Sequence, residues 1–219
     1  MSKDWTKIRA KVKDFIENEI YPKENELSKG TQESREILGS LMQLAKDEKI
    51  WALGHPKDIG GGGMPFMEYV YVNEVIGRSS FAMVALGTHS LQDSIMLREF
   101  ASSHWRDQYL EPLVQGKIFP SFGMTEPDVA SSDPTQLQTT ATLDNGSWKI
   151  NGRKWFTTGA SRAAYTTVMC RTELDAPSHG AFSMIIVPTD NPGYKIIRET
   201  PVLGINGGHY EVEYDNVEV

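Results

Sequence analysis

The chain has 219 residues, of which 39% are hydrophobic and 23% are charged. This composition is ordinary for a folded globular protein, and the length suffices for one large domain or two small ones. Aspartate and glutamate number 29 against 22 lysines and arginines, which gives a net charge of −7. No basic cluster stands out, so we expect no nucleic-acid partner, because such partners are held through Lys and Arg.

The N-terminal residues 1–5 lead directly into an amphipathic pattern and are unlike a signal or transit peptide, and no apolar run approaches membrane-spanning length. We therefore expect a non-secreted protein without a membrane span. It would be cytoplasmic in a bacterium, with the mitochondrial matrix or the peroxisome as alternatives in a eukaryote. The single Cys170 is expected to be a buried structural thiol. The five histidines are scattered, so no metal site is expected.

Apolar residues recur at helical spacing up to about residue 118 and at a period of two after it. The helical patterns cover residues 8–20, 37–45, 66–76, 81–100 and 102–114, and four glycines at 60–63 predict a connecting turn. Strands are expected over 118–124, 137–143, 148–150, 165–169, 182–187, 194–197 and 211–214, with a hairpin turn at Asp144-Asn145-Gly146. The sequence therefore predicts an α+β protein, with an all-helical N-terminal domain (1–118) before a β-barrel or sandwich domain (119–219).

Two stretches of the second domain are candidates for a binding site. The first runs Phe-Gly-Met-Thr-Glu-Pro-Asp-Val-Ala-Ser-Ser over residues 122–132, where an apolar strand leads into a turn of small residues. Such a strand end presents backbone N–H groups and a hydroxyl at one place, which suits the pyrimidine edge of a flavin. A plain exit from strand to turn is the alternative. The second stretch runs Asn-Gly-Arg-Lys-Trp-Phe-Thr-Thr-Gly over residues 151–159.

Together these stretches resemble the flavin-binding signature of the acyl-CoA dehydrogenases. Residues 53–63, 71–78, 85–91 and 109–116 resemble four further blocks of that family in the same order. The run at 126–132, together with Gly-Gly-His-Tyr-Glu at 207–211, looks most like the branch that is fused to a kinase-like domain in animals and acts on long-chain and 4-hydroxyacyl-CoA thioesters. The resemblance implies that the family's C-terminal helical domain is absent from this chain.

The resemblance also implies FAD as the cofactor and assigns residues to it. The residues that would face the flavin are Phe122, Met124, Thr125, Ser131, Phe156, Thr157 and Thr158. Those that would contact an acyl-CoA substrate are Ser131, Ser132 and Leu91. Phe156 stands where the family usually has Trp, and the neighbouring Trp155 leaves the register open by one residue. Ser132 is an apparent insertion, so which of the two serines serves the site is also open.

The function implied is α,β-dehydrogenation of acyl-CoA thioesters in fatty-acid β-oxidation, as part of a longer protein. Electrons would pass to an electron-transfer flavoprotein or a similar acceptor, and the complete protein would form a homo-oligomer. No catalytic base is identified. Glu126 is expected to support its loop and Glu74 to be solvated or at an interface, so the chain alone is predicted to be inactive. The alternatives are an acyl-CoA oxidase-like or hydroxylase-like flavoenzyme and a non-catalytic acyl-CoA-binding or assembly module.

Overall fold

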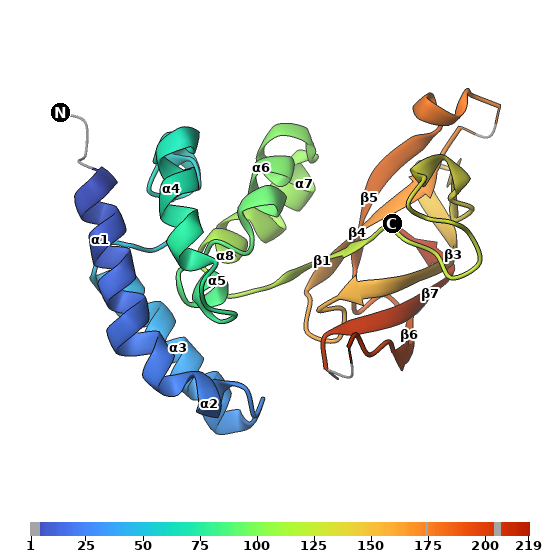
Figure 1. The fold of residues 1–219 in the computed structure, drawn as a ribbon. Helices are drawn as coiled ribbons and strands as arrows, with labels where there is room; N and C mark the ends of the chain where they lie inside the picture. The colour runs from blue at the N-terminus through green and yellow to red at the C-terminus, as the bar shows by residue number, and fades with distance from the viewer. Residues whose placement is uncertain (1–4, 174, 204–206) are drawn as a thin grey trace. The chain divides into compact units, whose positions relative to one another are not determined.

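The structure is a computed structural model that describes residues 5–173, 175–203 and 207–219. The chain divides into two compact units, Met1–Lys117 and Ile118–Val219. The first unit is helical and the second contains a curled β-sheet, as Figure 1 shows. The predicted fold class, a helical N-terminal domain followed by a β-rich one, is confirmed.

The first unit is built from short and medium helices around one apolar core. Its helical elements are α1 (Trp5–Phe15), η1 (Ile16–Ile20), η2 (Tyr21–Lys23), α2 (Glu24–Leu27), α3 (Gln32–Asp47), η3 (Lys57–Ile59), α4 (Phe66–Ile76), α5 (Ala82–Ala85), α6 (Leu91–Phe100), α7 (Ser103–Trp105), η4 (Arg106–Leu110) and α8 (Glu111–Val114). The apolar stripes of α1, α3 and α4 meet in the core, where Val12, Leu41 and Val72 are buried. No helix in the described part of the chain is long and apolar enough to cross a lipid bilayer.

The single helix predicted over 81–100 is wrong, because the chain breaks between α5 and α6 at Gly87. Gly87 has a φ of +67°, a conformation that favours glycine. A Cβ at Gly87 would lie 2.5 Å from the ring of Trp51. Trp51 in turn donates its indole N–H to the carbonyl of Val114 at 2.9 Å. The break therefore depends on long-range packing that local periodicity does not reveal.

His55 is a fully buried polar residue that joins the glycine-rich turn to this break. Its Nε2 lies 2.9 Å from the carbonyl oxygen of Gly87, and its Nδ1 lies 2.9 Å from Oγ of Ser94. Because a carbonyl only accepts, Nε2 carries the proton and Nδ1 accepts from Ser94. A Cβ at Gly61 would lie 2.2 Å from the His55 carbonyl oxygen, so this glycine is required by packing. Burial lowers the pKa of His55, against a smaller opposite effect of the Gly87 hydrogen bond.

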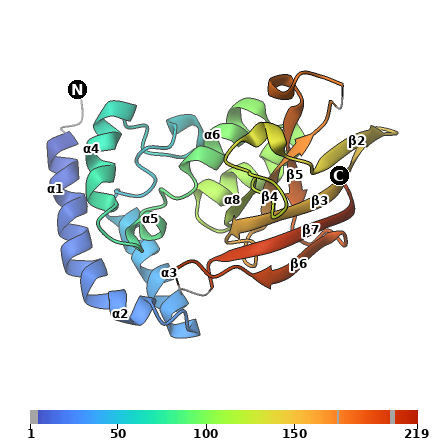
Figure 2. The ribbon, with the colours of Figure 1, turned by 45° about the vertical axis from the view of Figure 1, so that its right-hand side comes forward.

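The second unit is a seven-stranded sheet. Its strands are β1 (Pro120–Gly123), β2 (Thr140–Asp144), β3 (Ser147–Thr158), β4 (Tyr165–Arg171), β5 (Phe182–Pro188), β6 (Tyr194–Glu199) and β7 (His209–Glu218), with 3-10 turns η5 (Pro134–Gln136) and η6 (Ser178–Gly180). The strand order is β1-β4-β2-β3-β7-β6, with β5 paired to β4. Strand β1 runs parallel to β4, whereas β3 and β6 both run antiparallel to β7, and Figure 2 shows β3, β7 and β6 side by side.

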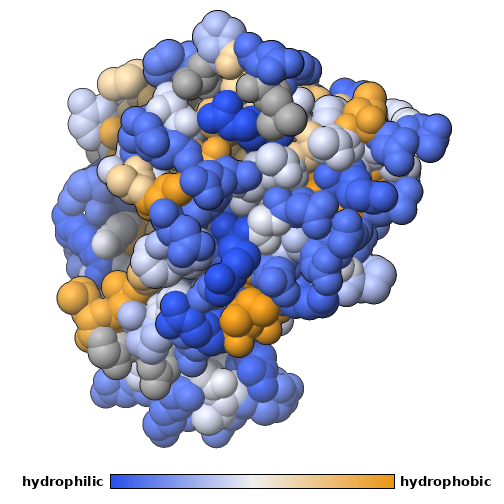
Figure 3. All heavy atoms as spheres, turned by 90° about the vertical axis from the view of Figure 1, so that its right-hand side faces the viewer, coloured by the Kyte–Doolittle hydropathy of each residue, from blue (hydrophilic) through white to orange (hydrophobic). Residues whose placement is uncertain are grey.

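The core of the second unit is formed by side chains from several of its strands, among which Ile150, Val168, Cys170 and Val212 are buried. The buried structural thiol predicted at Cys170 is confirmed. Burial raises its pKa to about 12, which leaves the thiol protonated and unreactive near neutral pH. The face in Figure 3 is predominantly hydrophilic, and the hydrophobic atoms visible on it form small separate groups.

The buried His55 makes the stability of the first unit depend on pH. Its pKa is lower in the folded than in the unfolded protein, so the folded state binds fewer protons. The contribution of His55 is therefore fully present above the unfolded pKa of about 6.5 and is lost as the pH falls below it, with a slope of at most about 1.4 kcal/mol per pH unit. Urea denaturation followed by far-ultraviolet circular dichroism, from about pH 7.5 to about pH 5.5, measures this slope.

A His55→Asn variant should be less stable at neutral pH. It should also lose the part of the pH dependence of stability that His55 contributes. His104 is exposed, and a His104→Asn variant is the matched control that should keep the wild-type slope. Equal slopes in wild type and the His55→Asn variant would contradict the assignment.

Candidate functional site

The two stretches singled out in the sequence lie side by side in the second unit, although about thirty residues separate them. Thr125 donates its hydroxyl proton to the carbonyl of Trp155 at 2.9 Å, and the backbone N–H of Trp155 donates to the carbonyl of Thr125 at 2.9 Å. Nearby, the Ser121 hydroxyl donates to the carbonyl of Thr158 at 2.8 Å. The exit of β1 and the end of β3 therefore form one continuous piece of structure.

A buried ion pair fixes this arrangement. Lys154 is fully buried, and its ammonium donates to the Glu126 carboxylate and to the carbonyl of Met124, both at 2.9 Å. The Glu126 carboxylate also accepts the backbone N–H groups of Gln138 at 2.7 Å and Thr139 at 2.8 Å. Burial acts to raise the pKa of Glu126, but these hydrogen bonds outweigh it and lower the pKa, so the carboxylate stays ionised.

The expected role of Glu126 as a support for its loop is confirmed. The same bonds explain a difference from the predicted strand over 137–143, because β2 begins only at Thr140. The N–H groups of Gln138 and Thr139 are bound by the Glu126 carboxylate and do not belong to the strand. Ser131 closes the same loop, since its hydroxyl accepts from the N–H of Glu126 at 2.7 Å.

Strand β3 carries a β-bulge just after Lys154, where its register against β7 shifts before Thr157. Inside the bulge, Phe156 has a φ of +49°, which is strained for a residue with a side chain. Lys154 is buried, whereas Phe156 and Thr158 are exposed and Thr157 between them is buried. The bulge therefore changes which side chains face outward, as bulges next to binding sites commonly do. The residue Phe156 is 42% exposed.

Strand β7 brings His209 next to the exposed residues Phe156 and Thr158. His209 is the register partner of Thr158, and its Nδ1 lies 2.9 Å from Oγ1 of Thr158. The ring centroid of Phe156 lies 6.5 Å from that of His209 in an edge arrangement and 4.7 Å from that of Trp155. We call Phe156, Thr158 and His209 the Phe156 face. It presents an aromatic surface beside a hydroxyl and an imidazole.

The other residues assigned from the sequence lie in different settings. Phe122 on β1 and Met124 at its exit are part-exposed, and Ser132 is exposed. Thr157 is fully buried, and its hydroxyl has no hydrogen-bond partner among the described residues. Leu91 belongs to the first unit, where it begins α6 and packs against the helical core.

Sequence reasoning did not assign His209 to the site. The signal that places it there is the pairing of β3 with β7, which brings His209 opposite Thr158. In the first unit, burial raises the pKa of Asp93 on α6 to about 6. An aspartate in the first turn of a helix usually stabilises the helix through its interaction with the helix dipole, so its position alone gives no functional signal. Glu74 pairs with Arg9 and Arg78 on the surface, in line with the solvated role expected for it.

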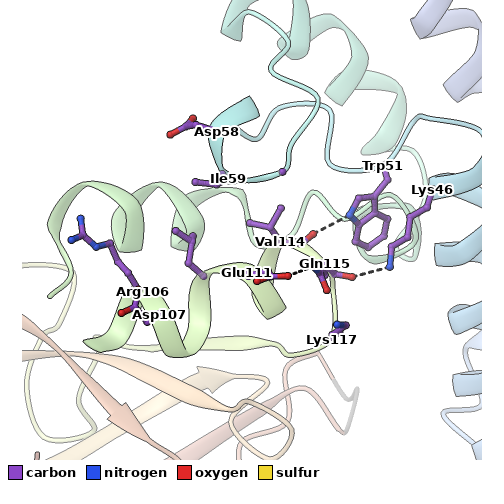
Figure 4. Close-up of a pocket in the computed structure, with 12 residues that line it drawn as sticks. Lys46, Trp51, Asp58, Ile59, Arg106, Asp107, Glu111, Val114, Gln115 and Lys117 are labelled. Atoms are coloured by element: carbon purple, nitrogen blue, oxygen red, sulfur yellow. Dashed lines mark hydrogen bonds between the residues drawn. The ribbon is translucent and has the colours of Figure 1, made fainter. Parts of the chain in front are cut away.

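The first unit has a hollow of its own, with a volume of 1040 Å³ (Figure 4). Its wall contains charges of both signs, among them Asp58, Arg106 and Glu111. On one side Lys46 donates to the carbonyl of Gln115 at 2.8 Å, as the dashed line in Figure 4 marks. None of the residues assigned from the sequence lines this hollow. Within the described ranges, no three His, Cys, Asp or Glu side chains are grouped as a metal site would require.

Removing one partner of the buried ion pair should destabilise the second unit strongly. A Lys154→Met variant leaves the buried Glu126 carboxylate without its counter-charge, which costs about 3–5 kcal/mol in the free energy of unfolding. The matched control is Lys195→Met, because Lys195 pairs with Asp215 at 2.6 Å while both side chains are nearly half exposed, and an exposed pair contributes about 1 kcal/mol or less. Urea denaturation measures both.

A double variant, Lys154→Met with Glu126→Gln, removes both charges and should recover part of the loss. Equal effects of Lys154→Met and Lys195→Met would contradict the assigned role of the buried pair.

The backbone strain at Phe156 should appear as a reversed preference between alanine and glycine. Alanine in the left-handed region is disfavoured by about 1–2 kcal/mol, a cost that glycine avoids. Phe156→Gly should therefore be more stable than Phe156→Ala by about 1 kcal/mol. Thr142 is an exposed residue of β2 that is not among the positive-φ residues. There alanine should be more stable than glycine by about 0.5–1 kcal/mol. The same sign at both positions would show that the Phe156 backbone is relaxed in solution.

Comparison with known proteins agrees with this division of the chain. The model of the acyl-CoA dehydrogenase N-terminal domain matches residues 2–117, and that of the acyl-CoA dehydrogenase middle domain matches residues 121–217. Acyl-CoA dehydrogenase family member 11 of Gallus gallus is 34% identical over 236 residues, which cover 100% of this chain and 30% of that protein. FadE2 of Mycobacterium tuberculosis is 40% identical over 190 residues, which cover 84% of this chain and 46% of that protein.

Solved structures support the same family assignment. A structure described as an acyl-CoA dehydrogenase from Mycobacterium abscessus superposes with a TM-score of 0.91 at 33% identity, covering 100% of this chain and 59% of that one. A glutaryl-CoA dehydrogenase from Mycobacterium smegmatis, solved in complex with FADH2, shares the fold with a TM-score of 0.74 at 24% identity, covering 100% and 54%. This chain spans about a third to a half of the two curated relatives named above. The chain belongs to the acyl-CoA dehydrogenase family and contains its N-terminal and middle domains.

Proposed function

We propose that this chain provides the flavin-contacting part of an FAD-dependent enzyme that dehydrogenates acyl-CoA thioesters between the α and β carbons, as part of a longer protein. Family membership supports the reaction class. The observation that carries the proposal is the convergence of residues 122–132 and 151–159, which the Lys154–Glu126 pair locks together in the second unit.

The Phe156 face suits the isoalloxazine ring of a flavin. That ring is planar and largely apolar, with hydrogen-bonding atoms along its edges. The Phe156 ring is exposed and is held outward by a strained backbone, and strain of this kind is concentrated at ligand sites. The hydroxyl of Thr158 and the imidazole of His209 lie beside it and match the polar edge. The glutaryl-CoA dehydrogenase of the same fold was solved with FADH2, which supports the same cofactor here.

Several residues of this chain would hold the cofactor, each through a different contact. Phe156 would pack against the ring, and Thr158 would bond its edge. The hydroxyls of Thr125 and Ser131 are already engaged within the protein, so they would act through their free lone pairs and the backbone around them. Phe122, Met124 and Thr157 complete the set. When bound, FAD supplies the acceptor for the hydride that leaves the β carbon.

The substrate would be an acyl-CoA thioester, with Ser131, Ser132 and Leu91 as the proposed contacts. Long-chain and 4-hydroxyacyl thioesters are the class we propose, because residues 126–132 and 207–211 resemble the branch of the family that is fused to a kinase-like domain in animals. Removal of the α proton needs a carboxylate base. Glu126 is committed to Lys154 and to two backbone N–H groups, so we propose that the base lies outside this chain. We also propose an electron-transfer flavoprotein or a similar acceptor as partner, and a homo-oligomer for the complete protein.

The full-length protein should bind FAD noncovalently, and Thr158 should contribute to its affinity. A Thr158→Val variant keeps the shape of the side chain and removes its hydrogen bond to the flavin, at a cost on the order of 1–3 kcal/mol, or about 5- to 150-fold in the FAD dissociation constant. Thr142→Val, at an exposed threonine of β2, is the matched control and should leave the constant unchanged. Fluorescence titration of the apoprotein with FAD measures it. A full-length protein that never shows flavin absorbance would overturn the proposed function.

Dye-linked reduction with acyl-CoA thioesters of different chain length tests the reaction itself. The full-length protein should reduce the dye, and residues 1–219 alone should not, because they lack the base. Fast production of hydrogen peroxide by the full-length protein would instead indicate an oxidase of the same architecture. Turnover by residues 1–219 alone would show that the base lies within this chain.

A further inference from the structure

The hydroxyl of Thr158 has a single proton to donate. Two acceptors are within reach. The carbonyl of Phe156 lies 3.5 Å away, at the limit of a hydrogen bond, whereas Nδ1 of His209 lies at 2.9 Å. The contact with His209 is therefore the stronger one, and Thr158 is its donor when the His209 proton lies on Nε2.

The backbone around His209 holds its imidazole in this position. His209 is paired with Thr158 in the β3–β7 ladder. Its carbonyl accepts the N–H of Thr200 at 2.8 Å, and the carbonyl of Gly208 accepts the N–H of Gly159 at 2.9 Å. The imidazole also lies edge-on to the Phe156 ring, with 6.5 Å between the ring centroids. The contact between His209 and Thr158 is thus built into the sheet.

We propose that His209 is a positioning residue that accepts the Thr158 proton and so leaves the lone pairs of Thr158 as an acceptor toward the flavin. The proposal rests on the proposed function, in which Thr158 bonds the flavin edge. Reduction of a flavin by two electrons with proton uptake converts an acceptor nitrogen of that edge into an N–H donor. A hydroxyl that shares its proton with His209 accepts fully from this N–H but donates only weakly to the oxidised nitrogen. His209 therefore favours the reduced flavin.

The midpoint potential of the flavin in the full-length protein tests this inference without measuring turnover. A His209→Leu variant frees the Thr158 proton for the oxidised flavin, so the ratio of affinities for reduced over oxidised flavin should fall about tenfold. For a two-electron couple this lowers the midpoint potential by about 30 mV. A His209→Asn variant supplies a side-chain oxygen as acceptor and should stay near the wild-type potential. His209→Ala takes the place of His209→Leu if the latter does not retain flavin.

A double variant at Thr158 and His209 separates this positioning role from a merely structural one. In a Thr158→Val variant the hydroxyl is gone, so adding His209→Leu should change the midpoint potential no further. A shift that persists in this background would overturn the inference, because His209 would then act without Thr158.

The remaining outcomes are also decisive. A potential that is unchanged or higher in the His209→Leu variant would overturn the inference while leaving flavin binding intact. A wild-type protein that binds no FAD would contradict the proposed function itself, and the inference with it.

Discussion

The buried ion pair between Lys154 and Glu126 is the constraint on which the site depends. Each charge would cost several kcal/mol if it were buried alone. Here the Lys154 ammonium has two acceptors, and the Glu126 carboxylate accepts from Lys154 and from two backbone N–H groups. These bonds join the exit of β1, the approach to β2 and the middle of β3. Displacing any one of the three segments would leave a buried charge without some of its hydrogen bonds, so the three keep a fixed arrangement.

Fixing β3 at Lys154 lets the next residues depart from regular strand geometry. The bulge after Lys154 and the positive φ of Phe156 are unfavourable by themselves. They persist because pairing resumes at Thr157, where β7 runs alongside. The outcome is an exposed aromatic ring beside the Thr158 hydroxyl, with His209 delivered to that hydroxyl by the register of β7. The rigid interior of the sheet therefore supports the strained residues on its surface.

Sequence patterns predicted those features that depend on local chemistry. The helix over 66–76 was predicted to its ends, and the hairpin turn at Asn145 and Gly146 has the positive φ values that its residues favour. The break at Gly87 was missed because it depends on the distant Trp51 ring. The bulge and the role of His209 were missed because both arise from the pairing of β3 with β7. The engagement of the Thr125 and Ser131 hydroxyls within the protein has no signature in the sequence either.

The central claim is that the Phe156 face receives the flavin. The most direct measurement is a crystal structure of the full-length protein with FAD bound. The account predicts the isoalloxazine ring packed against Phe156, with an edge atom within about 3.2 Å of the Thr158 hydroxyl oxygen and the Lys154–Glu126 pair intact. A flavin bound elsewhere, with Phe156 and Thr158 still facing solvent, would contradict it.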